Sequence, residues 1–99
     1  MKFNLDIELP VIYANLHWTE VRIIREAYIS KQKNKCWYCK QSLKKKPTKI
    51  MKRYPIDREL FPPGFFNYPV HLHHSHNSGL TIGAVHSYCN AVLRHYHGE

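Results

Sequence analysis

Four residues in two separate motifs have the types and spacing of a zinc site. Cys36 and Cys39 form a Cys-x-x-Cys motif, and His86 and Cys89 form a His-x-x-Cys motif. Two thiolates from one Cys-x-x-Cys turn need two further ligands to complete the tetrahedral coordination of one zinc ion. We therefore predict a structural Zn²⁺ bound by all four residues, with no open position for catalysis. The alternative is a thioredoxin-like redox motif, but the strand and βαβ pattern it requires are not evident.

A histidine-rich stretch, residues 71–97, holds seven of the eight histidines and is the predicted active site. His73 and His74 precede the polar segment 75–79, whose composition is typical of a tight turn between two strands. Neighbouring strand residues point to opposite faces, so one imidazole can face a metal and the other a substrate. The alternative interpretation is that both histidines are ordinary hairpin residues.

The segment after this hairpin has the composition of a helix that ends at Gly98. In such a helix His86 and Cys89 share a face one turn apart, and Asn90 lies beside them. Arg94 follows Asn90 by four residues, on the same face, and is a candidate phosphate contact. One helix therefore has the spacing to serve two neighbouring sites.

An amphipathic helix is predicted over residues 18–35, between an N-terminal arm (1–17) and the first cysteine motif. Thr19 is the expected N-cap, and Glu20 lies where the helix dipole favours an acid. The core-facing residues recur at three- and four-residue spacing: Val21, Ile24, Ala27 and Tyr28. Four prolines and one glycine between residues 54 and 70 argue against a long regular element, so residues 43–68 are predicted to form a loop.

A length of 99 residues fits one small domain, residues 1–99, for which a metal ion commonly supplements a limited core. A hydrophobic content of 43% favours a folded chain over a disordered one. No apolar stretch is long enough to span a bilayer, and the first residues lack the pattern of a signal peptide. We therefore predict a cytoplasmic protein with no membrane partner.

The formal charge of +8 is concentrated in one part of the chain. Ten of the fifteen Lys and Arg residues lie between residues 31 and 53, and no Asp or Glu occurs between residues 27 and 56. Such a block favours a polyanionic partner, most simply nucleic acid. The predicted contacts are Lys44, Lys45, Lys46, Lys49, Lys52, Arg53 and Arg94. A solvated loop kept soluble by its lysines is the alternative, and an anionic membrane surface is disfavoured because the block has no amphipathic face.

Together, the Cys-x-x-Cys motif, the His-rich hairpin and the helix with x-x-Cys-Asn resemble the HNH, or ββα-metal, nucleases. The phage recombination endonuclease VII type is the most similar. The resemblance covers residues 36–98 except the loop, and it implies an α+β fold: a small ββα-metal (HNH) domain with an N-terminal helix and a structural zinc site. It also implies a metal-dependent DNA endonuclease, with a phage origin and action inside the host cell.

Position by position, the resemblance assigns His73 and Asn90 to the catalytic divalent ion and His74 to the general base. His76 matches a further histidine of the family's hairpin. By resemblance, His74 activates a water that attacks the phosphodiester, and the products carry 5′-phosphate and 3′-hydroxyl ends. DNA is the implied partner.

The sequence departs from the family at three positions. His73 and Ser75 each stand where the endonuclease VII type has an aspartate, and His86 replaces a zinc cysteine. A neutral, softer ligand at position 73 lets Mn²⁺ or Ni²⁺ compete with Mg²⁺. The resemblance does not include the long helical extension with which resolvases of this type dimerise. Plain DNA cutting is therefore expected in place of junction resolution, and a homodimer stays possible.

Two other interpretations stay open. A catalytically silent zinc module would bind nucleic acid in a salt-sensitive way and break no strands with any divalent ion. A metal storage or sensing protein would use the histidines for further metal ions.

Overall fold

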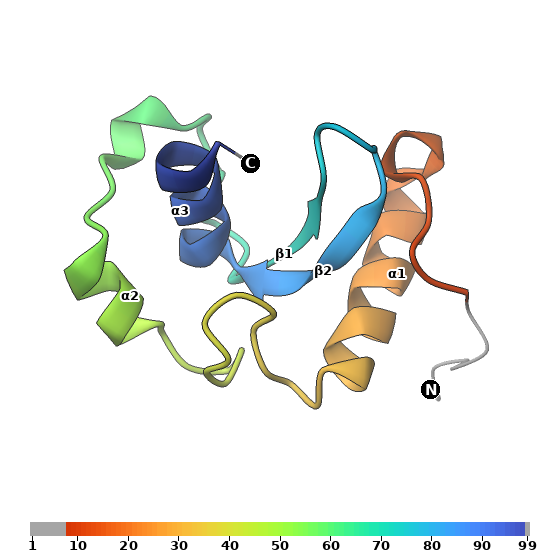
Figure 1. The fold of residues 1–99 in the computed structure, drawn as a ribbon, viewed down its shortest axis with the longest axis horizontal. Helices are drawn as coiled ribbons and strands as arrows, with labels where there is room; N and C mark the ends of the chain where they lie inside the picture. The colour runs from red at the N-terminus through yellow and green to blue at the C-terminus, as the bar shows by residue number, and fades with distance from the viewer. Residues whose placement is uncertain (1–7, 99) are drawn as a thin grey trace.

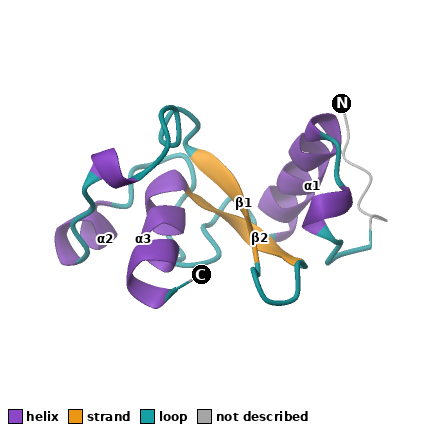
Figure 2. Ribbon diagram, turned by 90° about the horizontal axis from the view of Figure 1, so that it is seen from above, coloured by secondary structure: helices purple, strands orange, loops and turns teal. Residues whose placement is uncertain are grey.

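The computed structural model describes residues 8–98, and its centre is a two-stranded antiparallel hairpin between two helices (Figure 1). The elements in chain order are the 3-10 turn η1 (Tyr13–Asn15), α1 (Trp18–Lys31), α2 (Thr48–Arg53), the 3-10 turn η2 (Arg58–Leu60), β1 (Val70–His74), β2 (Thr81–His86) and α3 (Ser87–His97). Seen from above, the hairpin separates α1 from α3 and α2 (Figure 2). This confirms the prediction of a small domain that mixes helices with a short hairpin.

The helix α1 begins at Trp18, as predicted, but its N-cap differs from the prediction. His17, not Thr19, is the N-cap, and its Nδ1 accepts a hydrogen bond from the Thr19 backbone N–H. The Glu20 side chain in turn accepts from the His17 N–H at 3.0 Å. These two bonds form a capping box, in which an imidazole replaces the usual hydroxyl or carboxylate side chain.

The end of α1 also differs, because the helix stops at Lys31 and does not continue to residue 35. Lys33 and Asn34 adopt left-handed backbone angles, with φ of 56° and 62°, which end a right-handed helix. The predicted stripe is confirmed: Ile24 and Tyr28 are buried in the core cluster with Leu72 and Val85 of the hairpin. The helix therefore packs its apolar face on the sheet.

The hairpin forms where it was predicted. Its register pairs Val70 with His86 and His73 with Gly83, and an irregularity lies between His73 and His74. The turn is closed by a hydrogen bond from the Ser75 N–H to the Leu80 carbonyl at 2.9 Å.

The outer edge of β2 is covered by other parts of the chain. The Gln32 side chain accepts from the Ala84 N–H and donates to the Ala84 carbonyl, each at 2.9 Å. The Trp37 N–H also donates to that carbonyl at 2.9 Å. Nearer the turn, the Thr81 N–H donates to the Val11 carbonyl at 2.9 Å. The N-terminal arm and the first cysteine motif are therefore both attached to β2.

The junction of β2 and α3 corrects a further expectation. His86 is the last residue of β2 and the N-cap of α3, so it does not share a helical face with Cys89. At the other end, Gly98 adopts the left-handed conformation with φ of 71°, as predicted. The predicted loop 43–68 contains the six-residue helix α2, whose N-cap is Pro47. Within residues 8–98, no helix is long and apolar enough to cross a membrane.

Candidate functional site

All four predicted zinc ligands come together below the hairpin. The candidate ligand atoms of Cys36, Cys39, His86 and Cys89 lie within 4.8 Å of one another. His86 Nδ1 is 3.5 Å from Cys39 Sγ and 3.6 Å from Cys89 Sγ. Tetrahedral zinc with bonds of roughly 2.3 Å to sulfur and 2.05 Å to nitrogen separates the two ligand atoms by about 3.5–3.6 Å. The cluster therefore has the donor set and the dimensions to hold one metal ion such as zinc.

The orientation of the His86 ring suits this role. Its Nε2 lies 2.8 Å from both the Ser42 and the Lys45 carbonyl oxygens. Carbonyl oxygens only accept hydrogen bonds, so Nε2 carries the proton and Nδ1 presents a lone pair to the cluster. The loop after the Cys-x-x-Cys motif thereby fixes which ring nitrogen binds the metal.

The three thiols are crowded enough to control one another's ionisation. A hydrogen bond with Cys89 lowers the pKa of the Cys36 thiol, against the opposing effect of burial. The hydrogen bond with Cys36, together with burial, raises the pKa of Cys89, and burial raises the pKa of Cys39. Because thiolates are the metal-binding form of cysteine, the binding of a divalent ion to this cluster releases protons.

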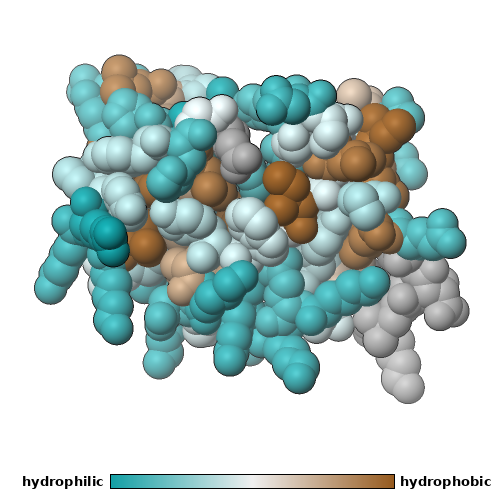
Figure 3. Space-filling model, viewed as in Figure 1, coloured by the Kyte–Doolittle hydropathy of each residue, from teal (hydrophilic) through white to brown (hydrophobic). Residues whose placement is uncertain are grey.

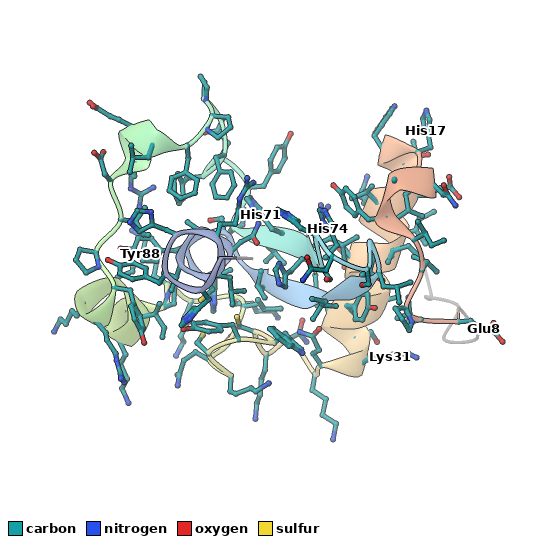
Figure 4. All side chains as sticks on the ribbon, turned by 45° about the horizontal axis from the view of Figure 1, so that its top comes forward. Glu8, His17, Lys31, His71, His74 and Tyr88 are labelled. Atoms are coloured by element: carbon teal, nitrogen blue, oxygen red, sulfur yellow. The ribbon has the colours of Figure 1, made fainter. Side chains whose placement is uncertain are left out.

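A second group of residues lines a cavity of about 290 Å³. Figure 4 shows His71 and His74 over β1, in the space between α3 and α1. The lining includes every predicted catalytic residue and the predicted phosphate contact: His73, His74, His76, Asn90 and Arg94. The structure therefore brings the whole predicted site into one place, although residues 73–76 and 90–94 come from different elements.

The same cavity contains two residues that the sequence analysis missed, His71 and Arg25. The Asn90 side-chain Nδ2 donates a hydrogen bond to His71 Nδ1 at 3.0 Å. Burial lowers the pKa of His71, and the Arg25 guanidinium adds to this effect. The available signal was the spacing: His71 lies two residues before His73, which places both side chains on one face of a regular strand.

His73 and His74 have different neighbours. His73 is buried, with 2% of its surface exposed, and its ring lies 5.9 Å from the Trp37 ring. His74 is half-buried and stacks on the Tyr13 ring. Burial lowers the pKa of His74, and the positive charges that His76, His73 and Arg94 can carry add to this. A neutral His74 imidazole is therefore favoured at neutral pH.

All seven predicted nucleic-acid contacts are exposed, but they occupy different places. Arg94 lines the histidine cavity, whereas Lys44, Lys45 and Lys46 line a separate cavity of about 330 Å³ beside α2 and the start of α3. No lysine occurs among the described residues that line the histidine cavity. Figure 3 shows long hydrophilic side chains projecting from the lower edge of the molecule. Lys44, Lys45 and Lys46, which we call the lysine-rich edge, thus lie on a surface separate from the histidine cavity.

Comparisons with known proteins give no match from which a function could be inferred. No family model, no curated protein and no solved structure matches the chain. The resemblance to the HNH nucleases accordingly rests on the sequence motifs alone.

Proposed function

We propose that the protein is a metal-dependent DNA endonuclease that hydrolyses phosphodiester bonds in the histidine cavity. The observation that carries the proposal is the convergence of His74, Asn90 and Arg94 on this cavity, next to a cysteine cluster with the dimensions of a zinc site. A neutral imidazole is a good base near pH 7, and a guanidinium is a strong phosphate ligand. Together these groups suit the attack of water on a phosphodiester.

Each residue has a separate task in this mechanism. His74 takes a proton from a water aligned with the scissile phosphorus. Arg94 and His76 contact the phosphate and orient it. The exposed lysine-rich edge supplies affinity for DNA that does not depend on sequence, because phosphate contacts position the duplex and carry no base information.

The donor set of the cavity fits a catalytic divalent ion held by His73 and Asn90. The described lining residues offer imidazole nitrogens and an amide but no Asp or Glu. Imidazole suits transition ions such as Mn²⁺ or Ni²⁺, whereas Mg²⁺ prefers oxygen ligands. When bound, such an ion supplies Lewis-acid stabilisation of the charge on the phosphoryl and leaving oxygens.

His71 gives Asn90 the orientation that this role needs. The amide nitrogen of Asn90 is engaged with His71 Nδ1, which leaves the amide oxygen available. Amide oxygen, not amide nitrogen, is the atom that binds divalent cations. His71 is therefore a positioning residue for the metal site.

The decisive experiment is the incubation of purified protein with supercoiled plasmid in Mg²⁺, Mn²⁺, Ni²⁺ or Zn²⁺. We expect open-circular or linear DNA with at least one ion, and a loss of about 10²- to 10⁴-fold in rate for His74→Ala. His95→Ala is the matched control, because His95 is an exposed histidine of α3 that does not line the histidine cavity.

Two other outcomes decide against the proposal. Cutting by His74→Ala at the wild-type rate would show that His74 is not the base. DNA that is retarded on a gel but not cut with any ion would support the alternative of a catalytically silent zinc module. The separation of the lysine-rich edge from the histidine cavity is the observation that favours this alternative.

A further inference from the structure

The N-terminal arm, to which the sequence analysis assigned no chemistry, reaches the histidine cavity. Ile12 forms an isolated antiparallel bridge with Leu80. One residue later, the Tyr13 N–H donates to the Gly79 carbonyl at 2.9 Å. These contacts fix the Tyr13 backbone against the turn that follows His74.

The side chain of Tyr13 is held against the predicted base. The Tyr13 and His74 rings are stacked, with centroids 3.9 Å apart and planes inclined by 6°. Both rings line the histidine cavity and a neighbouring cavity of about 280 Å³. Stacking of this kind is favourable and restricts rotation of the imidazole plane. It covers one face of the imidazole and leaves the nitrogen-bearing edge for proton transfer.

We propose that Tyr13 is a positioning residue that holds the His74 imidazole in the orientation required to take a proton from water. The inference rests on the proposed nuclease function, because that function gives His74 its role. The contact is between ring faces, so phenylalanine should replace tyrosine, whereas an aliphatic side chain should not. The arm then completes the candidate active site from outside the segment that resembles the HNH nucleases.

Initial cleavage rates at increasing plasmid concentration test this role. For Tyr13→Leu we expect kcat to fall about 10- to 100-fold with KM unchanged, because the base is present but poorly oriented. Tyr13→Phe should restore the wild-type kcat. Asn15→Ala is the matched control, because Asn15 belongs to the same arm, is exposed and does not line either cavity.

Nuclear magnetic resonance of the zinc-loaded protein gives a readout that does not depend on cleavage. The His74 ring protons, identified by their loss in His74→Ala, should be shifted upfield by the Tyr13 ring current in wild type and in Tyr13→Phe. In Tyr13→Leu they should move to the positions of an unstacked histidine.

The outcomes separate this inference from the proposed function. A wild-type kcat for Tyr13→Leu, or identical His74 signals in Tyr13→Leu and Tyr13→Phe, overturns the positioning role while the nuclease proposal stands. If wild type itself cuts no DNA, the proposed function fails, and a His74 signal without an upfield shift removes the stacking as well.

Discussion

The cysteine cluster and the histidine cavity share α3 but are built in opposite ways. The cluster is closed: Cys36, His86 and Cys89 are buried and Cys39 is half-buried. Two backbone carbonyls fix the orientation of the His86 imidazole. The cavity is open and lined by imidazoles, one amide and two guanidinium groups. Saturated coordination favours stability, whereas open positions beside neutral bases favour chemistry. Adjacent residues of α3 thus belong to different sites: Cys89 to the cysteine cluster and Asn90 to the histidine cavity.

If the cysteine cluster is a structural zinc site, removal of its metal should have the largest effect on folding. Structural zinc contributes about 10–16 kcal/mol of apparent binding energy in zinc-finger peptides, comparable to the whole stability of a small domain, about 5–15 kcal/mol. We expect Cys36→Ser, or wild type treated with a chelator, to lose its helical circular dichroism. His74→Ala should stay folded under the same conditions. A chelated protein that keeps its native spectrum would contradict the structural role.

Substitution of His71 should affect the reaction more than the fold. His71→Leu removes the acceptor that orients the Asn90 amide, so we expect cleavage to fall about 10- to 100-fold, as for other groups that orient metal ligands. His71→Gln offers an amide oxygen as an alternative acceptor and should recover part of the rate. Single-turnover cleavage in Mn²⁺ measures both variants, and equal rates for Leu and Gln would argue against the orienting bond.

A methyl group at position 83 should disturb the boundary between the two regions. Gly83 pairs with His73, and a Cβ there would meet Gln32 Oε1 at 2.8 Å and the Trp37 side chain at 3.0 Å. Overpacking of this kind typically costs about 1–3 kcal/mol. We expect Gly83→Ala to lower the free energy of unfolding in urea by this amount. The same substitution at Gly79 meets no atom within 4 Å and tests only its positive φ of 76°.

The smallest effect is expected on the lysine-rich edge. Lys45→Ser removes one exposed charge that does not line the histidine cavity, so kcat should not change. If Lys45 contacts a phosphate, the slope of log affinity against log salt should fall by about 0.9. Fluorescence anisotropy with labelled duplex DNA measures this slope. Arg22→Ser, on the exposed face of α1, is the control that should leave it unchanged.

Residue type and spacing were sufficient to predict the cysteine cluster and the hairpin. Metal ligation restricts the choice of residue so strongly that three cysteines and one paired histidine were enough to predict which four residues lie together in the cluster. The hairpin was predictable because the polar segment 75–79 has the composition of a turn. Both signals are local, or are carried by chemically rare side chains.

The details that were missed depend on contacts that a sequence does not display. The role of His71 requires knowledge that Asn90 lies within hydrogen-bond distance across the cavity. The stacking of Tyr13 on His74 joins residues 61 positions apart, so no periodicity marks it. The N-cap was assigned to Thr19 because hydroxyl side chains are the usual caps, whereas the His17 imidazole makes the bond here.

The covered edge of β2 has a consequence for association. A two-stranded sheet usually presents free N–H and C=O groups to which another chain can add a strand, a common start of aggregation. At Ala84 these groups are already bonded to Gln32 and Trp37, and at Thr81 the N–H is bonded to Val11. Further chains therefore find no template for strand addition at these positions of β2.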